Sequence, residues 1–363
     1  MGNIVTYAEQ MLAPFSSEPF HSVDSLILSW ISYMHLPSGL SDIHSWKGVR
    51  FADLFRAEYF EELFRGVWDT DSSRRLFTAM AASPRFRDIR VMGYTERIDK
   101  KEEKQFAAVS FQLNDDLCYV AFRGTDSTLV GWKEDFNMAF QYPVPAQEDA
   151  RIYLEETACH CTGQIMTGGH SKGGNLAVYA AANASPAVQE RILHAYSHDG
   201  PGFLDTVLQS EPFVAIRDKI DKTLPQSSLV GMLLEQQENY QIVESNRFSF
   251  WQHDPFSWVV EGNCFHFIKD LTPDARYFDH TLNEWVRSMS IPERERFVDS
   301  LFGLIDTEHI DSVDQLRAER QKSIPAILRA ASQMDADTKG FLTQTVRALL
   351  SLSIRNVPEL LKK

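Results

Sequence analysis

The sequence Gly-His-Ser-Lys-Gly-Gly at residues 169–174 constrains the fold of this chain more than any other segment. It follows a short stretch at 164–167 that predicts a strand, and it leads into an Ala- and Leu-rich stretch at 172–184 that predicts a helix. A strand that turns directly into a helix brings the backbone on the two sides of the turn very close together. Side chains two residues before and after Ser171 would collide there, and both positions are glycine. The segment therefore predicts a tight strand–turn–helix with Ser171 at its apex.

The middle of the chain alternates between segments with strand character and segments with helical periodicity. Residues 106–113 and 118–122 predict a β-hairpin around the turn Asn114-Asp115-Asp116. The other predicted elements are a helix at 146–160, the strand at 164–167, the helix at 172–184 and strands at 192–197 and 240–244. This alternation indicates an α/β fold with a mostly parallel central sheet that is flanked by helices on both faces.

Helical periodicity marks the two ends of the chain. Residues 1–65 predict a helical N-terminal segment, residues 66–269 the α/β core, and residues 270–363 a helical C-terminal appendage. No internal repeat or long linker separates these parts, so we expect a single domain over residues 1–363. The terminal helices are compatible with a lid, with the surface of a homodimer or with plain scaffold, and the sequence leaves these three arrangements open.

Charge and hydropathy exclude several classes of function. The chain has 363 residues and a net charge of −14, whereas nucleic-acid binding relies on clustered Lys and Arg. The same negative charge disfavours tight adhesion to anionic membranes. No run of 18 apolar residues is present, so we expect no membrane span, and the N-terminus lacks the pattern of a secretory signal. We therefore expect a cytoplasmic protein that does not bind nucleic acid.

The cysteines indicate neither a disulfide framework nor a metal site. There are four, at positions 118, 159, 161 and 264, which is too few to staple a chain of this length. Cys159-His160-Cys161 has a spacing that is unusual for structural zinc, and no second paired cluster follows it. We therefore expect reduced thiols, no metal ion and no organic cofactor.

Residues 169–173 match the pattern G-x-S-x-G, which carries chemistry as well as shape. In this pattern the serine is exposed on a strained turn between a strand and a helix, where it acts as a nucleophile. The first turn of the following helix places its partial positive charge beside the oxyanion that forms during acyl transfer. The strand and helix that the motif requires are both predicted here, so we expect Ser171 to be a catalytic nucleophile.

An oxyanion hole needs a second backbone donor from the loop after an earlier strand. The sequence Phe-Arg-Gly-Thr-Asp at 122–126 directly follows the predicted strand 118–122. We therefore expect the amides of Thr125 and Lys172 to be the two donors, with the Thr125 hydroxyl as a candidate third. Arg123 and Asp135 are expected to be scaffold residues that fix this loop through a salt bridge.

Two strings of the sequence resemble the class 3 lipases of the α/β-hydrolase superfamily. They are residues 122–138, which begin Phe-Arg-Gly-Thr-Asp, and residues 169–177, Gly-His-Ser-Lys-Gly-Gly-Asn-Leu-Ala. In their longer form they are similar to an uncharacterised bacterial branch of that group, over about residues 20–310. The resemblance implies an α/β-hydrolase fold with Ser171 as the nucleophile, and it leaves the substrate open because one fold hosts many chemistries.

The catalytic base is sought among the histidines downstream of Ser171, because the chain order in this superfamily is Ser, acid, His. His253 lies in a loop after the last predicted strand, where the base belongs, and that loop is similar to the His loop of the resembled branch. His194 and His198 come too early, on the strand that follows the nucleophile helix. The remaining candidates are His266, His280 and His309. We expect His253 to be the base.

The acid of the triad is expected to be Asp199, which ends the predicted strand 192–197 and precedes Gly-Pro-Gly. This position resembles that of the acid in pancreatic-type lipases. Class 3 lipases place the acid one strand later, but residues 224–231 of this chain lack an Asp. Asp221 and Asp254 are the alternatives.

Together these residues predict a serine carboxylester hydrolase, lipase-like in its core, that acts on lipid or small acyl esters through an acyl-enzyme on Ser171. Two alternatives stay open. One is an acyl-transfer enzyme that acts on amides or thioesters, and the other is a catalytically silent scaffold on a hydrolase fold.

Overall fold

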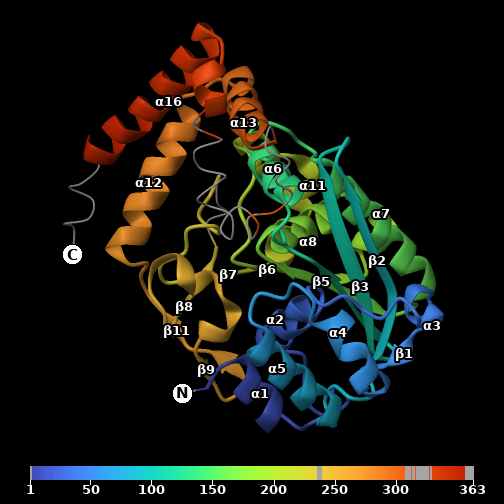
Figure 1. The fold of residues 1–363 in the computed structure, drawn as a ribbon. Coiled ribbons are helices and arrows are strands. Elements are labelled where there is room, and N and C mark those ends of the chain that lie inside the picture. The colour runs from blue at the N-terminus through green and yellow to red at the C-terminus, as the bar shows by residue number, and fades with distance from the viewer. Residues whose placement is uncertain are drawn as a thin grey trace. The chain divides into compact units, whose positions relative to one another are not determined.

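The computed structural model describes residues 2–234, 239–306, 312, 315, 327 and 329–355, and Figure 1 shows its fold. These residues form two compact units. The first unit comprises Met1–Arg97, Phe106–Gly124 and Ala146–Thr272, and the second comprises Ile98–Gln105, Thr125–Pro145 and Pro273–Lys363. The single domain and the boundaries at 65 and 269 that the sequence suggested stay predictions.

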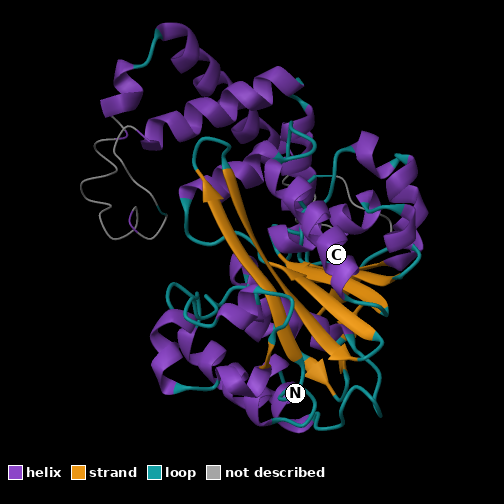
Figure 2. Ribbon diagram, turned by 90° about the vertical axis from the view of Figure 1, so that its right-hand side faces the viewer, coloured by secondary structure: helices purple, strands orange, loops and turns teal. Residues whose placement is uncertain are grey.

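The first unit is built on a nine-stranded sheet in the order β1-β2-β3-β4-β5-β6-β7-β8-β11, drawn in orange in Figure 2. Its strands are β1 Val49–Arg50, β2 Arg90–Asp99, β3 Lys104–Asn114, β4 Leu117–Phe122, β5 Gln164–His170, β6 Ile192–His198, β7 Ile220–Pro225, β8 Gln241–Val243 and β11 Phe267–Ile268. Strands β4 to β8 are mutually parallel, while β1 on β2, β3 on β4 and β11 on β8 are antiparallel. Strands β9 Val260–Glu261 and β10 Cys264–Phe265 form a separate antiparallel pair.

Helices connect the parallel strands, as a parallel sheet requires. The connections contain α7 Pro145–His160, α8 Lys172–Asn183, α9 Pro186–Gln189, α10 Asp205–Leu208, α11 Glu211–Ile216 and the 3-10 helix η3 Arg217–Lys219. This is the α/β-hydrolase arrangement, so the predicted fold is confirmed. The predicted hairpin, the strands after it and the helices at 146–160 and 172–184 are all present, with ends that differ by a few residues.

Each face of the sheet has its own apolar core, which explains why the central strands read as continuous apolar runs. Along β4 the side chains alternate between the two. Tyr119 and Ala121 pack with the N-terminal helices on one face, and Val120 and Phe122 pack with α7 and α8 on the other. All four are fully buried. The central strands are therefore held from both sides, which gives the residues at their ends a rigid support.

The N-terminal segment is mainly helical, as predicted, and packs on one face of the sheet. It contains α1 Ile4–Gln10, α2 Ser22–Ile31, α3 Ser41–His44, η1 Phe51–Leu54, η2 Ala57–Tyr59, α4 Phe60–Leu63 and, after it, α5 Thr70–Ala82. Helix α2 lies against β5. Its Asp24 caps its own first turn through the amide of His21 at 2.8 Å and forms a fully buried ion pair with Arg85 at 2.6 Å. Because each charge of this pair has its partner, the helix is fixed in position without an unpaired buried charge.

A buried network of hydrogen bonds joins α2 to strands β4 and β6 of the sheet. The Tyr119 hydroxyl lies 2.7 Å from the Ser25 hydroxyl and 2.9 Å from that of Ser29. Ser25 also lies 2.8 Å from Nε2 of His198. His198 is fully buried, and its Nδ1 has no hydrogen-bond partner among the described residues. Burial lowers the pKa of His198 to about 3, so its imidazole stays neutral.

The regular secondary structure of the second unit is mainly helical over its described residues, apart from the tip of the β2–β3 hairpin. It contains α6 Leu129–Asn137, α12 Pro273–Arg287, α13 Ile291–Asp306 and α16 Ala336–Arg355. Lys133 on α6 pairs with Glu103 at 2.7 Å and with Asp299 on α13 at 2.8 Å. Trp285 on α12 donates its indole proton to the carbonyl of Thr345 on α16 at 3.0 Å. The predicted C-terminal helices are thus present where the chain is described, and residues 307–311, 313–314, 316–326, 328 and 356–363 lie outside that part.

Two further observations bear on the sequence-based expectations. Among the described residues, no helix has the length and apolar character needed to cross a membrane. The four cysteines all lie in the described part of the chain, and none of them forms a disulfide bond.

Candidate active site

Ser171 lies at the apex of the turn between β5 and α8, as the motif predicted. Its backbone has φ 59° and ψ −135°, a strained conformation for a residue with a side chain. The Ser171 amide donates to the carbonyl of His198 at 3.0 Å, and the amide of Gly174 donates to the Ser171 carbonyl at 2.9 Å. These bonds hold the strained residue in place and join it to the end of β6.

The glycines on both sides of Ser171 are required by close backbone approach. A Cβ on Gly169 would lie 2.1 Å from the carbonyl carbon of Gly173. A Cβ on Gly173 would lie 2.1 Å from the carbonyl oxygen of Phe122, at the end of β4. Neither position has space for a side chain, so the steric reason inferred from the sequence is confirmed.

The loop after β4 also reaches the nucleophile. A Cβ on Gly124 would lie 3.0 Å from Cβ of Ser171 and 2.6 Å from the carbonyl oxygen of His170. Residue 124 must therefore be glycine for the loop to come this close. The loop is anchored by Arg123, which is buried and pairs with Glu96 of β2 at 2.7 Å.

Glu96 is the partner of Arg123 that the sequence did not reveal. Its carboxylate lies 3.0 Å from Nδ1 of His35 and accepts the Tyr94 hydroxyl proton at 2.9 Å. Burial opposes its ionisation, but hydrogen bonds and charge from His35 and Arg123 outweigh it and lower the pKa of Glu96 strongly. The loop is thus anchored by an ionised carboxylate.

The two predicted oxyanion donors differ in their setting. Lys172 is the first residue of α8, so its amide has no acceptor within the helix itself, and its side chain is buried. Thr125 is the first residue of the Thr125–Pro145 segment of the second unit, and its hydroxyl donates to the Asp135 carboxylate at 2.6 and 2.8 Å. The hydroxyl proton is therefore engaged, which leaves the Thr125 amide as the predicted donor. Arg123 thus pairs with Glu96 and Asp135 accepts from Thr125, while the salt bridge expected between Arg123 and Asp135 stays a prediction.

Asp199 and His253 are brought together from positions far apart in the sequence. Nδ1 of His253 lies 2.6 Å from Oδ2 of Asp199. Asp199 directly follows β6, has a positive φ of 50° and is fully buried, while the His253 side chain is about one-fifth exposed. This pairing fixes Nδ1 as the protonated nitrogen of a neutral His253 and leaves Nε2 as the basic one.

The second oxygen of Asp199 is also bound. Oδ1 accepts the Ser228 hydroxyl proton at 2.5 Å and the Gly231 amide proton at 3.1 Å. Ser228 and Gly231 lie after β7, within the segment where class 3 lipases carry their acid. Three hydrogen bonds thus fix the orientation of this buried carboxylate.

The loop that carries His253 is fixed through its neighbour Gln252. The Gln252 side chain accepts from the Ser227 amide at 2.8 Å and donates to the Arg247 carbonyl at 2.9 Å. Its backbone carbonyl accepts the indole proton of the fully buried Trp258 at 2.8 Å. His253 ends the 3-10 helix η4 Ser249–His253, and Pro255–Ser257 forms the next one, η5.

The other candidate acids and bases are engaged elsewhere. Asp221 pairs with His194 at 2.5 Å, and both side chains are nearly half exposed. Asp254 pairs with Arg247 at 2.5 Å. His266 lies 3.0 Å from Glu261, and His280 lies 3.8 Å from Glu284 on α12. His309 lies outside the described residues.

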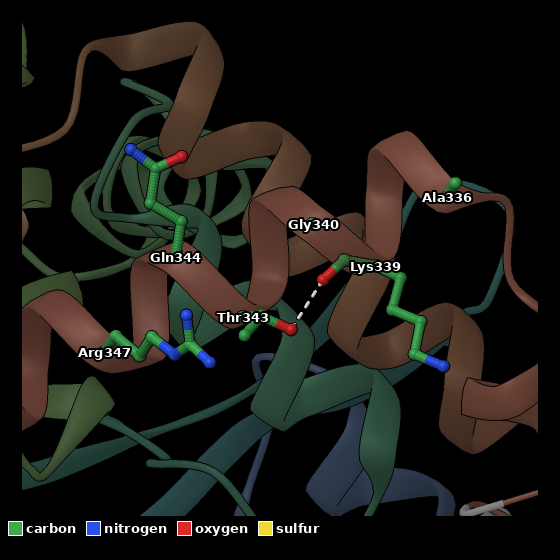
Figure 3. A pocket seen from close by; sticks show the side chains of 6 residues that line it. All are labelled: Ala336, Lys339, Gly340, Thr343, Gln344 and Arg347. Carbon is green, nitrogen blue, oxygen red and sulfur yellow. Dashed lines mark hydrogen bonds between the residues drawn. The ribbon is translucent and has the colours of Figure 1, made fainter.

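No comparable chemistry appears at the surface hollow drawn in Figure 3. It lies along α16 and is lined by Ala336, Lys339, Gly340, Thr343, Gln344 and Arg347. The Thr343 hydroxyl donates to the Lys339 carbonyl at 2.7 Å, and the lining contains two cations but no acid. Within the described part of the chain, no group of three or more His, Cys, Asp and Glu side chains is arranged to hold a metal ion.

Three solved structures that are similar to this chain are lipases of low sequence identity. A fungal lipase in complex with an inhibitor is 13% identical over 66% of this chain and 77% of its own, with a TM-score of 0.38. The M37 lipase is 13% identical over 59% and 70%, with a TM-score of 0.39. A Rhizomucor miehei lipase in its propeptide complex is 14% identical over 54% and 67%, with a TM-score of 0.34.

Comparison with curated proteins gave no match. The sequence profile of the family described as Mbeg1-like matches residues 80–303. These residues include Asp199, His253 and the strand–turn–helix around Ser171, called the elbow below. Because this match extends over more than half of the chain, the chain belongs to the Mbeg1-like family.

Proposed function

We propose that this protein is a serine hydrolase that cleaves carboxylic esters through an acyl-enzyme on Ser171. The observation that carries the proposal is the Asp199–His253 hydrogen bond of 2.6 Å, together with the strained backbone of Ser171. The turn at Ser171 is joined to the backbone next to the buried acid, because the Ser171 amide donates to the carbonyl of His198, the residue before Asp199. A serine, an imidazole and a buried carboxylate in this chain order are the components of a catalytic triad.

Each residue has a defined role in the proposed mechanism. Oγ of Ser171 attacks the acyl carbon of the ester and passes its proton to Nε2 of His253. Asp199 keeps the imidazole in the tautomer that accepts this proton, and it stabilises the imidazolium that results. The backbone amide of Lys172 donates to the oxyanion of the tetrahedral intermediate, and the Thr125 amide is the second donor that the sequence predicts.

The reaction is then completed in two stages, release of the alcohol and hydrolysis of the acyl-enzyme. The bond to the leaving alcohol breaks, the alcohol takes the proton from His253, and the acyl group stays on Ser171. Water attacks this acyl-enzyme while His253 accepts one of its protons, and a second tetrahedral intermediate releases the carboxylic acid. The proton returns from His253 to Ser171, so one ester and one water give one alcohol and one acid.

The decisive test is covalent labelling by a fluorophosphonate probe, which reacts with activated serines and needs no knowledge of the substrate. We expect the wild-type protein to be labelled and Ser171→Ala to be unlabelled. Ser16→Ala, which alters an exposed serine, is the matched control and should label like the wild type. Labelling that persists in Ser171→Ala would overturn the nucleophile, and a wild type that is never labelled would identify a silent scaffold.

Kinetic assays of the wild-type protein and Ser171→Ala then show whether esters or other acyl compounds are the substrates. Turnover of p-nitrophenyl esters of increasing chain length is compared with turnover of the matching anilides and thioesters. An ester hydrolase should turn over the esters fastest, and the preferred chain length then identifies the acyl class. Faster turnover of the anilides or the thioesters would contradict the ester assignment while leaving Ser171 as the nucleophile.

A further inference from the structure

His170, the last residue of β5, is bonded directly to the backbone of His253. Nε2 of His170 lies 2.8 Å from the carbonyl oxygen of His253. A carbonyl oxygen can only accept, so Nε2 of His170 must carry a proton. The bond reaches His253 itself, in addition to the bonds that hold the neighbouring Gln252.

The other nitrogen of His170 faces Tyr33, just beyond the end of α2. The Tyr33 hydroxyl lies 3.2 Å from Nδ1 and 3.2 Å from the His170 carbonyl oxygen. Because Nε2 holds the ring proton, both atoms of His170 are acceptors that share the one Tyr33 proton. The same hydroxyl lies against the loop after β4, since a Cβ on Gly124 would be 2.0 Å from its oxygen. Tyr33 and His170 thus form a continuous contact from the loop that flanks Ser171 to the loop that carries His253.

The imidazole of His170 also covers one face of the His253 ring. The two ring centroids are 4.4 Å apart, and the planes are inclined by 35°. His170 itself is only 2% exposed, with Trp30 and Trp258 edge-on to it at 6.1 and 6.4 Å. Burial, and the proximity of His253, hold the pKa of His170 well below its usual value. His170 therefore stays neutral and does not repel His253 when that ring is protonated.

We propose that His170 is the positioning residue for His253, holding the base in place through its carbonyl and through ring contact without taking part in proton transfer. The inference rests on the proposed function, in which His253 is the base. If position 170 needed only to fill space, any aromatic side chain of similar size would serve there. The hydrogen bond to His253 demands a donor at the position of Nε2, and that difference can be tested.

Two substitutions separate the donor from the ring. His170→Phe keeps an aromatic ring against His253 but removes the donor, whereas His170→Gln removes the ring and places an amide N–H at about the reach of Nε2. A displacement of reacting groups by about 1 Å costs about 10²-fold in rate. We therefore expect His170→Phe to lower kcat and the fluorophosphonate labelling rate about 10²-fold with little change in KM. His170→Gln should stay within a few-fold of the wild type.

Each variant is assayed well below its own Tm, so that unfolding does not contribute to the result. His170→Phe at the wild-type rate would overturn the inference, because the hydrogen bond would then be dispensable. An equal loss of rate in the Phe and Gln variants would also overturn it, since it would show that only packing matters. A wild type that is not labelled by the probe would instead count against the proposed function.

A second readout needs no catalytic activity. The proton shared by Nδ1 of His253 and Asp199 should give a low-field proton NMR signal in the wild-type protein. We expect this signal to persist in His170→Gln and to broaden or disappear in His170→Phe, where His253 is no longer fixed. An unchanged signal in His170→Phe would refute the positioning role even if no substrate is turned over.

Discussion

Asp199 holds Nδ1 of His253 at 2.6 Å with one oxygen, while its other oxygen accepts two protons from the segment after β7. The carboxylate is fully buried, so its orientation is set by these hydrogen bonds and not by solvent. In Asp199→Asn the side-chain amide would donate toward Nδ1 and force the opposite tautomer of His253. We expect kcat for ester hydrolysis to fall about 10⁴-fold, as loss of the triad acid does in serine proteases.

The control for this experiment is Asp221→Asn, which changes the alternative acid on β7. Asp221 pairs with the exposed His194 and should leave kcat near the wild-type value. Steady-state kinetics on one p-nitrophenyl ester measure both variants. If Asp221→Asn is the slower enzyme, the acid has been assigned to the wrong strand.

Ser228→Ala tests the support of the acid without removing it. The variant loses the 2.5 Å hydrogen bond to Oδ1 of Asp199 and keeps the bond from the Gly231 amide. A hydrogen bond to a charged group is worth about 1.5–3 kcal/mol, so we expect kcat to fall by at least about tenfold. Ser227→Ala is the matched control, because Ser227 is equally buried but bonds to Thr272. Equal kcat in the two variants would show that the hydroxyl of Ser228 is dispensable.

Gly173→Ala tests the steric requirement of the elbow. The new Cβ would lie 2.1 Å from the Phe122 carbonyl oxygen, so β4 or the start of α8 must shift. Overpacking of this kind costs about 1–3 kcal/mol, and the displaced Ser171 should react with the fluorophosphonate probe about 10²-fold more slowly. Gly39→Ala is the control, since a Cβ at position 39 would meet no atom within 4 Å. A Gly173→Ala protein with the wild-type Tm and labelling rate would contradict the geometry described.

His198 predicts how stability depends on pH. Its pKa is about 3 in the folded protein because of burial, and about 6.5 in an unfolded chain. Between these values the unfolded state binds one more proton, so the free energy of unfolding decreases as the pH falls, by about 1.4 kcal/mol per pH unit. The destabilisation begins near pH 6.5 and is complete near pH 3.

Urea unfolding of His198→Gln at pH 7, 6 and 5 measures this contribution. The variant cannot take up the proton, so its stability should decline less steeply with falling pH than that of the wild type. His280→Gln, which removes a histidine that is more than half exposed, should leave the slope unchanged. Parallel curves for wild type and His198→Gln would show that His198 does not contribute to acid sensitivity.

Local spacing was enough to predict the elbow and the elements beside it. The glycines at 169 and 173 indicate a close backbone approach, and the apolar run 118–122 predicts a central strand. Both signals arise within a few residues, where steric and hydrophobic constraints act directly. Strand β2, Arg90–Asp99, was not predicted because its outer half is charged and Gly93 interrupts it with a positive φ of 65°.

The contacts that support the site were beyond prediction from the sequence. Glu96 is one of many acidic residues until the sheet places it beside Arg123, and Ser228 is one of several serines until it meets Asp199. His170 was visible in the motif, but its bond to His253 depends on a loop far along the chain. Such pairings are decided by tertiary structure, because no local propensity favours one partner over another. The roles of Thr125, Lys172, Asp199 and His253 are proposals, and the experiments above address those of Asp199 and His253.

The hydrogen bond between Ser228 and Asp199 also has an evolutionary consequence. Ser228 stands after β7, at the strand end where class 3 lipases carry their acid, and its side chain already touches the acid that stands after β6. An ancestor with carboxylates at both positions would need them to share one proton, since two like charges in contact cannot both ionise. From that intermediate, either carboxylate could then be lost. The pairing of residues 199 and 228 means that two single-residue changes are enough to move the carboxylate from the end of one strand to the end of the next.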